Sequence, residues 1–492
     1  MSLINVTNLT FAYEGSYDNL FENVSFQIDS DWKLGFTGRN GRGKTTLLNL
    51  LLGKHEYKGN ISTNVSFEYF PFVVANQEIA TLDAVGELFP DYVHWKLLRE
   101  LSLLDVSEEA LYRPFRTLSN GEQTKVLLAT LFLKENSFLL IDEPTNHLDM
   151  TARKLVGNYL NSKSGFILVS HDRSFLDSCI DHILSINKTN IDIQKGNFSS
   201  WWENKKRQDN FELAENEKLK KDIFHLAEAA KRTGGWSNEV EKTKYGTKHS
   251  GSKADKGYIG HKAAKMMKRS KSMENRQQSA IREKSKLLKN IEDTENLKIT
   301  QLCYVQSRLA ELQNISIFYQ DKMICKDINF RIEQGDRIVL MGKNGSGKSS
   351  ILKLICGEKI SYTGSFMRGS QLKLSYVPQD TSHLQGNLTD YAAKNNVNES
   401  LFKTILRKLD FSRVQFEKEI STFSSGQKKK VLIAKSLAER AHLYIWDEPL
   451  NYIDVISRVQ IEEVLLEYKP TILFVEHERR FSDNIATKEV NI

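Results

Sequence analysis

The stretch GRNGRGKTT at residues 38–46 decides the fold, because it returns as GKNGSGKSS at residues 342–350. Both copies fit the pattern GxxxxGK followed by Thr or Ser, and both follow a strand-like apolar run, KLGFT in the first and RIVLM in the second. Glycines in such a loop let main-chain N–H groups point at phosphate oxygens, while the lysine meets the terminal phosphates and the hydroxyl faces Mg²⁺. The alternative is a glycine-rich turn that happens to precede a helix, and two copies in phase argue against it.

Three further motifs repeat at nearly the same interval, which indicates that one domain is duplicated. The separation is 304 residues between the loop lysines, 305 between two acidic motifs and 306 between two histidines that each follow an apolar strand. Strand-like and helix-like segments alternate in each copy, so we predict an α/β fold with a mainly parallel central sheet. The repeated segments are LSNGEQTK at 118–125 and FSSGQKKK at 423–430, LLIDEPTNHLD at 139–149 and YIWDEPLNYID at 444–454, and ILVSHDRSF at 167–175 and LFVEHERRF at 473–481.

The composition is that of a globular chain of more than one domain. Its 492 residues exceed the size of one hydrophobic core, so we expect two domains and a connector. With 40% hydrophobic residues and no apolar run near the length of a bilayer span, we expect no membrane segment. The chain shows no signal-peptide pattern and its four cysteines form no CxxC pair, which favours a reducing cytoplasm and no structural zinc.

Positive charge is concentrated in the connector. The whole chain has a formal net charge of +7, whereas residues 205–289 hold 23 Lys and Arg against 11 Asp and Glu, a local charge of +12. Subtracting +12 from +7 leaves −5 for the flanking domains. Local charge of this kind is typical of a segment that binds a polyanion.

Two acidic residues end a buried strand in each copy, Asp142 and Glu143 in the first and Asp447 and Glu448 in the second. The Asp is placed to hold Mg²⁺, and the Glu can polarise a water for in-line attack on a terminal phosphate. The histidine after the next apolar strand suits a sensor of that phosphate. Solvated charges and a core histidine are the structural alternatives. The candidate catalytic residues are Glu143, Glu448, His171 and His477.

The order of these motifs resembles that of the ATP-binding cassette (ABC) ATPases. LSNGEQ at 118–123 and FSSGQ at 423–427 look like the signature motif of that family. The resemblance implies that the signature of each domain closes over the nucleotide held by the other, where a helix N-terminus brings positive potential to the phosphates. The residues concerned are Ser424 and Gly426, opposite Lys44, and Ser119 and Gly121, opposite Lys348.

The resemblance also implies ATP and Mg²⁺ as cofactors, with an aromatic residue stacked on adenine in each site. Those aromatic residues, Tyr13 and Tyr319, lie 31 and 29 residues before the loop lysines, and a core role is their alternative. The remaining expected ATP-binding residues are Gly38, Asn40, Gly41, Gly43, Lys44, Thr45, Thr46, Gly342, Asn344, Gly345, Gly347, Lys348, Ser349 and Ser350. The expected Mg²⁺ ligands are Thr45, Ser349, Asp142, Asp447 and Gln379.

The two copies depart from each other in two places. The first copy has Phe72 where YVPQ of the second copy has Gln379, and phenylalanine can neither ligate Mg²⁺ nor hydrogen-bond a water. The second copy has Leu450 and Tyr452 in place of a threonine and a histidine near its last motif aspartate. We therefore expect unequal sites, with slower hydrolysis or a different metal arrangement in the first.

The connector predicts an antiparallel helical hairpin. Residues 198–231 are rich in helix formers, Gly234 and Gly235 are expected to end that helix, and a second helix is expected over 261–291. Helices of about 30 residues would carry the tip roughly 45 Å from the domains. The tip loop, about 233–262, combines lysines with aromatic side chains that can stack on unpaired RNA bases, a solvated linker being the alternative. The seam residues are Leu219, Ile223, Leu226 and Ala230 facing Met266, Met273, Ala280 and Leu287, and the tip residues are Trp236, Tyr245, His249 and Tyr258.

Tandem cassettes joined by a basic connector resemble the ABC-F group of ribosome-binding ATPases. The expected domains are an ABC ATPase domain at 1–197, the hairpin at 198–300 and a second ABC ATPase domain at 301–492. The resemblance implies a cytoplasmic monomer whose cassettes pair within the chain. Its arm would enter the tRNA exit site of the 70S ribosome, near the peptidyl transferase centre of 23S rRNA and the P-site tRNA.

Within that group two features resemble the antibiotic-resistance branch: the long tip, and an interval between Phe72 and Ser119 that leaves little room for an extra arm in the first domain. That branch protects ribosomes from lincosamides, streptogramins A and pleuromutilins. Three alternatives stay open: a housekeeping ABC-F translation factor, the ATPase subunit of a drug exporter, and a DNA-maintenance ATPase with a coiled-coil insert.

Overall fold

The computed structural model describes residues 2–14, 19–134, 136–146, 148–186, 191–242, 297–319, 322–343 and 345–492, with scattered positions between 261 and 279. By its contacts the chain divides into two compact units. One comprises Met1–Trp201 and Thr294–Ile492, and the other comprises Trp202–Asp293. The first unit contains both copies of the duplicated domain, which we call the first repeat (up to residue 201) and the second repeat (from residue 294). Asn344, most of the expected tip loop and most of the second hairpin helix lie outside the described residues.

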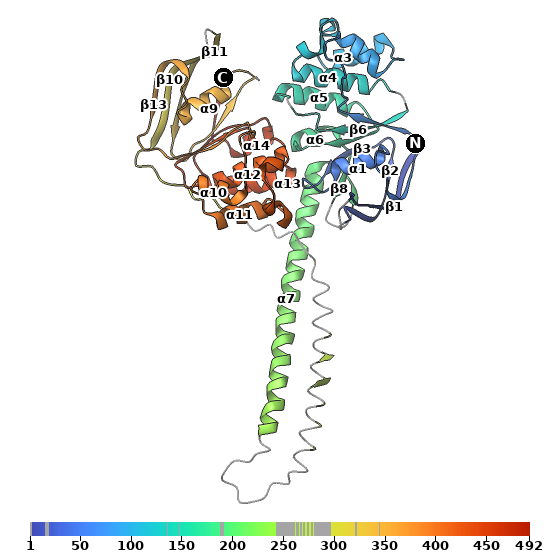
Figure 1. Cartoon of the computed structure of the whole chain (residues 1–492), viewed down its shortest axis with the longest axis vertical. Helices are drawn as coiled ribbons and strands as arrows, with labels where there is room; N and C mark the ends of the chain where they lie inside the picture. Colours follow the sequence, from blue (N-terminus) through green and yellow to red (C-terminus); the bar gives the residue numbers. More distant parts are fainter. Residues whose placement is uncertain are drawn as a thin grey trace, which may run out of the picture. The chain divides into compact units, whose positions relative to one another are not determined.

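The first repeat is built on a six-stranded sheet in which β9 alone is antiparallel to its neighbour (Figure 1). The strand order is β5 (Ser66–Phe70), β6 (Ser137–Asp142), β7 (Phe166–Val169), β3 (Lys33–Thr37), β8 (His182–Ile186) and β9 (Ile191–Lys195). A smaller antiparallel sheet has the order β2 (Phe21–Asp29), β1 (Leu3–Phe11) and β4 (Lys58–Ser62).

The second repeat has the same arrangement. Its central sheet is wholly parallel, with the order β14 (Leu374–Val377), β15 (Leu443–Asp447), β16 (Ile472–Val475), β12 (Arg337–Met341) and β17 (Lys488–Asn491). Its antiparallel sheet has the order β11 (Lys322–Glu333), β10 (Arg308–Tyr319) and β13 (Ser361–Arg368). The predicted α/β fold with mainly parallel central sheets is confirmed for both repeats.

Helices cover the central sheets, so the central strands are buried on both faces. The four residues of β7 and of β16 are all buried, as continuous apolar runs in parallel sheets require. The helices of the first repeat are α1 (Lys44–Leu51), α2 (Thr81–Leu88), α3 (His94–Leu103), α4 (Asn120–Leu131), α5 (Met150–Asn161) and α6 (Arg173–Cys179). Those of the second repeat are α9 (Lys348–Cys356), α10 (Leu388–Lys394), α11 (Glu399–Lys408), α12 (Ser425–Ala438), α13 (Val455–Tyr468) and α14 (Arg479–Ile485).

The connector begins with the helix α7, which runs from Phe198 to Lys242 over 45 residues (Figure 1, green). The prediction that Gly234 and Gly235 end this helix is wrong, and Trp236 lies inside α7 rather than in a loop. Each glycine costs a helix about 1 kcal/mol relative to alanine, but it keeps its N–H donor, so a helix of good formers can continue through a pair.

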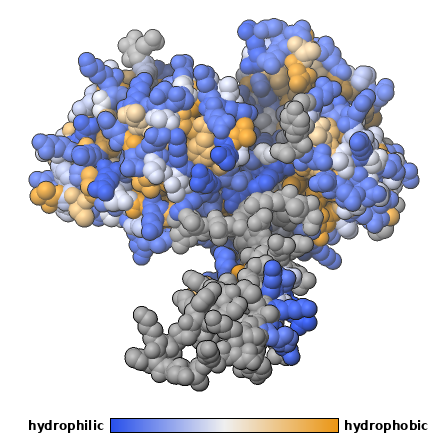
Figure 2. Space-filling model, turned by 60° about the horizontal axis from the view of Figure 1, so that its bottom comes forward, coloured by the Kyte–Doolittle hydropathy of each residue, from blue (hydrophilic) through white to orange (hydrophobic). Residues whose placement is uncertain are grey.

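The surface is mainly hydrophilic on the face that Figure 2 shows, with apolar side chains in small groups. The exposed large apolar residues include Val73, Trp95 and Tyr112 in the first repeat and Val305 and Val414 in the second. Singly exposed apolar residues are ordinary in folded proteins. Within the part of the chain that the structure describes, the search for a helix both long and apolar enough to span a membrane finds none.

Candidate nucleotide sites

Each phosphate loop closes on its own lysine. Lys44 Nζ donates to the carbonyl oxygens of Gly38 (2.8 Å) and Arg39 (3.2 Å), and Lys348 Nζ donates to the equivalent carbonyls at 2.9 and 2.8 Å. The glycine just before each lysine has a left-handed backbone, with φ of 91° and 99°. A side chain there would be strained, so the glycines allow the N–H groups of α1 and α9 to face one point. Both loops therefore fit a bound phosphate chain.

The first candidate nucleotide site is a cavity of about 680 Å³. The structure brings Lys44 and the acidic strand end of the first repeat together with the signature segment of the second, as the resemblance implies. The cavity is lined by Tyr13, Leu20, Asn40, Gly41, Gly43, Lys44, Thr45, Thr46, Tyr69, Pro71, Asp142, Glu143, Val169, His171, Ser424, Ser425, Gly426 and Tyr452.

The second candidate nucleotide site is a cavity of about 830 Å³, lined by Lys348 and by the signature segment of the first repeat. The predicted residues that line it are Tyr319, Gly345, Gly347, Lys348, Ser349, Ser350, Gln379, Glu448, His477, Ser119 and Gly121. Gly342 lies beside a smaller cavity of about 220 Å³ together with Lys348 and His477. The ligand roles of all these residues stay predictions.

Both signature segments present the start of a helix to the cavity they line. Ser119 caps α4 by accepting from the main-chain N–H of Glu122 at 3.2 Å, and the Glu122 carboxylate accepts from the N–H of Ser119 at 2.8 Å. Ser424 and Gln427 make the same reciprocal pair at the start of α12, at 3.3 and 3.0 Å. Such a capping box fixes the helix start, so its N–H groups and positive dipole end face the cavity.

The second repeat touches the first phosphate loop directly. Asn40 Nδ2 donates to the carbonyl oxygen of Tyr452 at 2.8 Å, and Gly426 lies against the same carbonyl. A Cβ atom on Gly426 would lie 2.3 Å from that oxygen and 2.9 Å from Asn40 Nδ2. At the matching place in the second site, a Cβ on Gly121 would meet Leu148 Cδ2 at an ordinary 3.6 Å. At the signature position, therefore, close packing requires a glycine in the first site and not in the second.

We expect Gly426→Ala to weaken nucleotide binding at the first site, because a main-chain oxygen cannot move aside as a flexible side chain can. Overpacking of this kind costs about 1–3 kcal/mol. Gly121→Ala is the matched control and should change affinity less than twofold. Titration of each variant with a fluorescent ATP analogue measures both effects. Equal affinities for the two variants would contradict the tight contact at Gly426.

The candidate metal ligands of each site lie around the carboxyl end of one strand, β6 in the first repeat and β15 in the second. In the first site Asp142 Oδ2 accepts from the Thr45 hydroxyl at 3.3 Å and from the Tyr69 hydroxyl at 3.0 Å. In the second site Asp447 is buried beside Ser349, and none of the described residues hydrogen-bonds to its Oδ1. Burial raises the pKa of both aspartates above the ordinary value. A hydroxyl and a carboxylate are hard oxygen donors that suit Mg²⁺, which would favour the ionised form.

The two candidate catalytic glutamates have different surroundings. His171 Nε2 lies 3.3 Å from Glu143 Oε1, and burial together with Asp142 raises the pKa of Glu143 to about 8. Burial, and then the charge of Lys44, lowers the pKa of His171 well below its ordinary value, so that histidine is neutral. The first site thus holds its glutamate with a single side-chain neighbour among the contacts described.

Glu448 is held by three side chains. Its Oε2 accepts from Gln379 Nε2 at 2.7 Å and from Asn451 Nδ2 at 2.6 Å, and its Oε1 lies 3.2 Å from His477 Nε2. Burial alone would raise its pKa, but the hydrogen bonds from His477 and Gln379 bring the pKa of Glu448 below the ordinary value. The geometry of the two sites is therefore unequal, while their hydrolysis rates stay predictions.

The sequence reasoning missed several residues at these sites. Tyr69 lies three residues before Phe72, and Asn451 lies within the repeated segment YIWDEPLNYID, so aligning the two copies residue by residue would have identified both. Phe72 itself packs against a lysine: the Lys134 ammonium lies 5.5 Å from the centre of its ring. Lys429 could have been found from the KKK of the second signature segment, where the first copy has Thr124.

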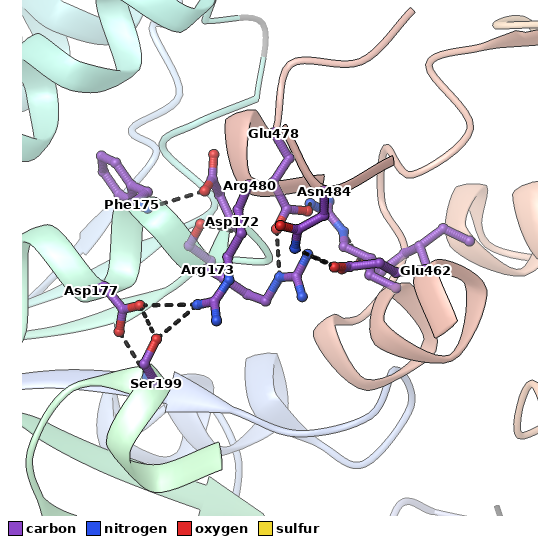
Figure 3. Close-up of polar contacts among 12 residues, drawn as sticks. Asp172, Arg173, Phe175, Asp177, Ser199, Glu462, Glu478, Arg480 and Asn484 are labelled. Atoms are coloured by element: carbon purple, nitrogen blue, oxygen red, sulfur yellow. Dashed lines mark hydrogen bonds and ion pairs between the residues drawn. The ribbon is translucent and has the colours of Figure 1, made fainter. Parts of the chain in front are cut away.

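A buried ion cluster joins the two repeats (Figure 3). Arg173, two residues after His171, donates through Nε to Glu478 at 2.6 Å and through Nη2 to Glu462 at 2.5 Å. All three side chains are at most 8% exposed. Glu478 directly follows His477. The cluster therefore joins the chain just after His171 to the chain just after His477, the two candidate phosphate sensors.

The first turn of α7 lies beside the same cluster (Figure 3). The Ser199 hydroxyl donates to Asp177 Oδ2 at 2.5 Å and accepts from Arg480 Nη1 at 2.8 Å. Asp177 belongs to α6 of the first repeat and Arg480 to α14 of the second. One serine at the start of the connector helix thus contacts both repeats.

A family described as ABC transporter matches residues 21–146 and 325–451, about half of the chain. Both phosphate loops, both signature segments and both acidic strand ends fall inside these ranges. The chain belongs to the ABC transporter family. It is an ATPase of that family, and its two ABC domains bind ATP.

Two relatives are similar to this ABC ATPase over nearly its whole length. It is 28% identical to the ATP-binding protein Uup of Buchnera aphidicola subsp. Acyrthosiphon pisum (strain APS), covering 99% of this chain and 80% of that protein. It is also 28% identical to the ribosome protection protein VmlR of Bacillus subtilis (strain 168), covering 100% of this chain and 86% of that protein.

Solved structures share the tandem ABC fold. The archaeal ribosome recycling factor aABCE1, in complex with the archaeal ribosomal stalk protein aP1, superposes with a TM-score of 0.63 at 17% identity. The match covers 98% of this chain and 87% of that one. This likeness concerns the fold alone.

Proposed function

We propose that this ABC ATPase is an ABC-F protein that binds the ribosome in the cytoplasm and protects translation from lincosamides, streptogramins A and pleuromutilins. The observation that carries the proposal is the whole-length similarity to a protein named for ribosome protection. Two features of the chain support it: a basic connector between the repeats, and nucleotide cavities that each take residues from both repeats.

The proposed cycle uses the chain's own residues as follows. With ATP in both sites, the signature serines and glycines close over the nucleotides and hold the repeats together as a monomer. The closed form binds the 70S ribosome at the tRNA exit site, and the connector tip contacts 23S rRNA near the peptidyl transferase centre and the P-site tRNA. Mg²⁺, when bound by Thr45 and Asp142 or by Ser349 and Asp447, supplies charge neutralisation at the phosphates. Glu143 and Glu448 orient the attacking water, and hydrolysis releases the ribosome.

Replacing residues 243–260 with a short Gly-Ser turn should abolish drug protection and leave ATP turnover intact, because the two sites lie in the repeats. Protection is measured as protein synthesis in a purified translation system with each drug class, with and without the variant. A matched insertion of the same turn after Glu358, in an exposed loop of the second repeat, is the control. Protection that survives the tip replacement would place the function elsewhere.

The rival function is that of an ABC-F translation factor without drug protection. It is favoured by the equal similarity to a protein named only for ATP binding. The same translation assay separates the two, since a housekeeping factor would raise synthesis equally with and without drug. A chain that lowers drug accumulation in cells but leaves purified translation unchanged would instead be the ATPase of an exporter.

A further inference from the structure

Lys429 is a buried lysine on α12 that the expected site does not include. Only 2% of the surface of Lys429 is exposed. Its Nζ donates to the main-chain carbonyl of Pro378 at 2.9 Å and to that of Asp447 at 3.4 Å. Burying an ammonium group is costly unless its hydrogen bonds are met, so a lysine in this place indicates a specific task.

The two carbonyls belong to the segments that carry the catalytic contacts of the second site. Pro378 directly precedes Gln379, and Asp447 directly precedes Glu448. The side chains of Gln379 and Glu448 are themselves joined at 2.7 Å. The Lys429 amine therefore binds the main chain of both segments. Each of its two bonds is made one residue before a member of the Gln379–Glu448 pair. Lys429 also lines the second cavity together with Gln379 and Glu448.

The same helix reaches the first site through its N-terminal end. Ser424, Ser425 and Gly426 line the first cavity, and Gly426 packs against the Tyr452 carbonyl and Asn40. Gly426 and Lys429 are three residues apart on α12, about 4.5 Å along a helix axis. A helix is stiff over less than one turn, so a displacement of its start by a nucleotide in the first site also displaces Lys429.

The first repeat lacks this arrangement. Thr124 stands at the position of Lys429, and its hydroxyl donates to the Asn120 carbonyl within its own helix at 2.8 Å. Phe72 stands at the position of Gln379. The lysine and the glutamine thus occur together in one repeat and are both replaced in the other.

We propose that Lys429 is a positioning residue through which ATP in the first site sets the rate of hydrolysis in the second. The coupling runs in one direction for turnover, because the first repeat has no counterpart to Lys429. Couplings between binding affinities must be reciprocal, but couplings to a turnover rate need not be. The inference rests on the ATPase activity of the family and is independent of ribosome binding.

The test measures phosphate release by the full-length chain in a Glu143→Gln background, so that the second site dominates turnover. Lys429→Met should lower kcat at least tenfold with less than a twofold change in KM for ATP. Lys429→Arg, which keeps the donor, should restore at least a third of the original kcat. Thr124→Met is the matched control in the first repeat and should change kcat less than twofold.

A double-mutant cycle then tests the direction of coupling. In the same background, Lys44→Ala weakens ATP binding in the first site and should lower second-site kcat at least fivefold when Lys429 is present. In the Lys429→Met variant, Lys44→Ala should lower second-site kcat by less than a further twofold, because Lys429 no longer couples the two sites. Additive losses would overturn the proposal, as would a Lys429→Met variant whose kcat is unchanged. If Lys429→Met does not fold, the cycle is run with Lys429→Gln, and additive losses there overturn the proposal equally.

Discussion

The double variant in which Gln replaces both Glu143 and Glu448 should turn over ATP about 10²- to 10⁴-fold more slowly, because each site loses its candidate general base. ATP binding should persist, since neither carboxylate contacts a loop lysine among the described hydrogen bonds. A chain that binds ATP without hydrolysing it should remain closed. Sedimentation with 70S ribosomes should therefore recover more of the double variant than of the unmodified chain after dilution into ATP-free buffer.

The single variants separate the two sites. Glu448 is held by Gln379, Asn451 and His477, whereas Glu143 has His171 alone at 3.3 Å. Glu448→Gln should consequently remove most of the turnover, and Glu143→Gln should remove the smaller part. Phosphate release by the two single variants measures the division. A double variant that leaves ribosomes at the unmodified rate would contradict the assignment of the carboxylates.

Removing the guanidinium of Arg173 should destabilise the contact between the repeats by about 3 kcal/mol, because it leaves two buried carboxylates with fewer partners. After Arg173→Ala, Glu478 keeps Arg458 at 3.0 Å and Glu462 keeps Asn484 at 2.6 Å. These remaining bonds place the expected loss at the low end of the range for a broken buried pair. Urea unfolding of the full chain, followed by fluorescence, should show a lower midpoint for the variant.

Arg479 provides the matched control. It occupies the position of Arg173 in the second repeat, but its side chain is 72% exposed and it pairs with Asp483 on its own helix at 3.5 Å. The position in the first repeat that matches Glu462 is Gly157, which offers no carboxylate. Arg479→Ala should therefore change stability by less than about 1 kcal/mol. Equal midpoints for the two arginine variants would show that the Arg173 cluster adds nothing to the contact between the repeats.

The duplicated phosphate loop was enough to predict the α/β fold of both repeats. A loop of glycines, a lysine and a hydroxyl residue has one dominant physical use, and the buried apolar runs before it require a parallel sheet covered by helices. The residues expected around each nucleotide, such as Lys44 with Ser424 and Lys348 with Ser119, do lie in common cavities. Their roles stay predictions until a ligand or a variant tests them.

The end of the connector helix was predicted wrongly, for a reason that lies in energetics. Two glycines lower helix propensity by an amount comparable to a few favourable neighbours, so the sequence alone did not decide between a stop and a continuation at Gly234. The structure continues α7 to Lys242.

Which side chains meet across the molecule was decided only by the tertiary structure. Arg173 lies 305 positions before Glu478, Asn40 lies 412 before Tyr452, and Lys429 reaches back 51 to Pro378. Periodicity and capping describe interactions within a few residues, whereas these contacts depend on how whole sheets and helices pack. The sequence by itself therefore determined the repeated fold and the chemistry available in each loop. The packing determined that the repeats share an ion cluster and that Lys429 lies between the signature helix and the catalytic strand of its repeat. Burial makes such charges stable only where their partners converge.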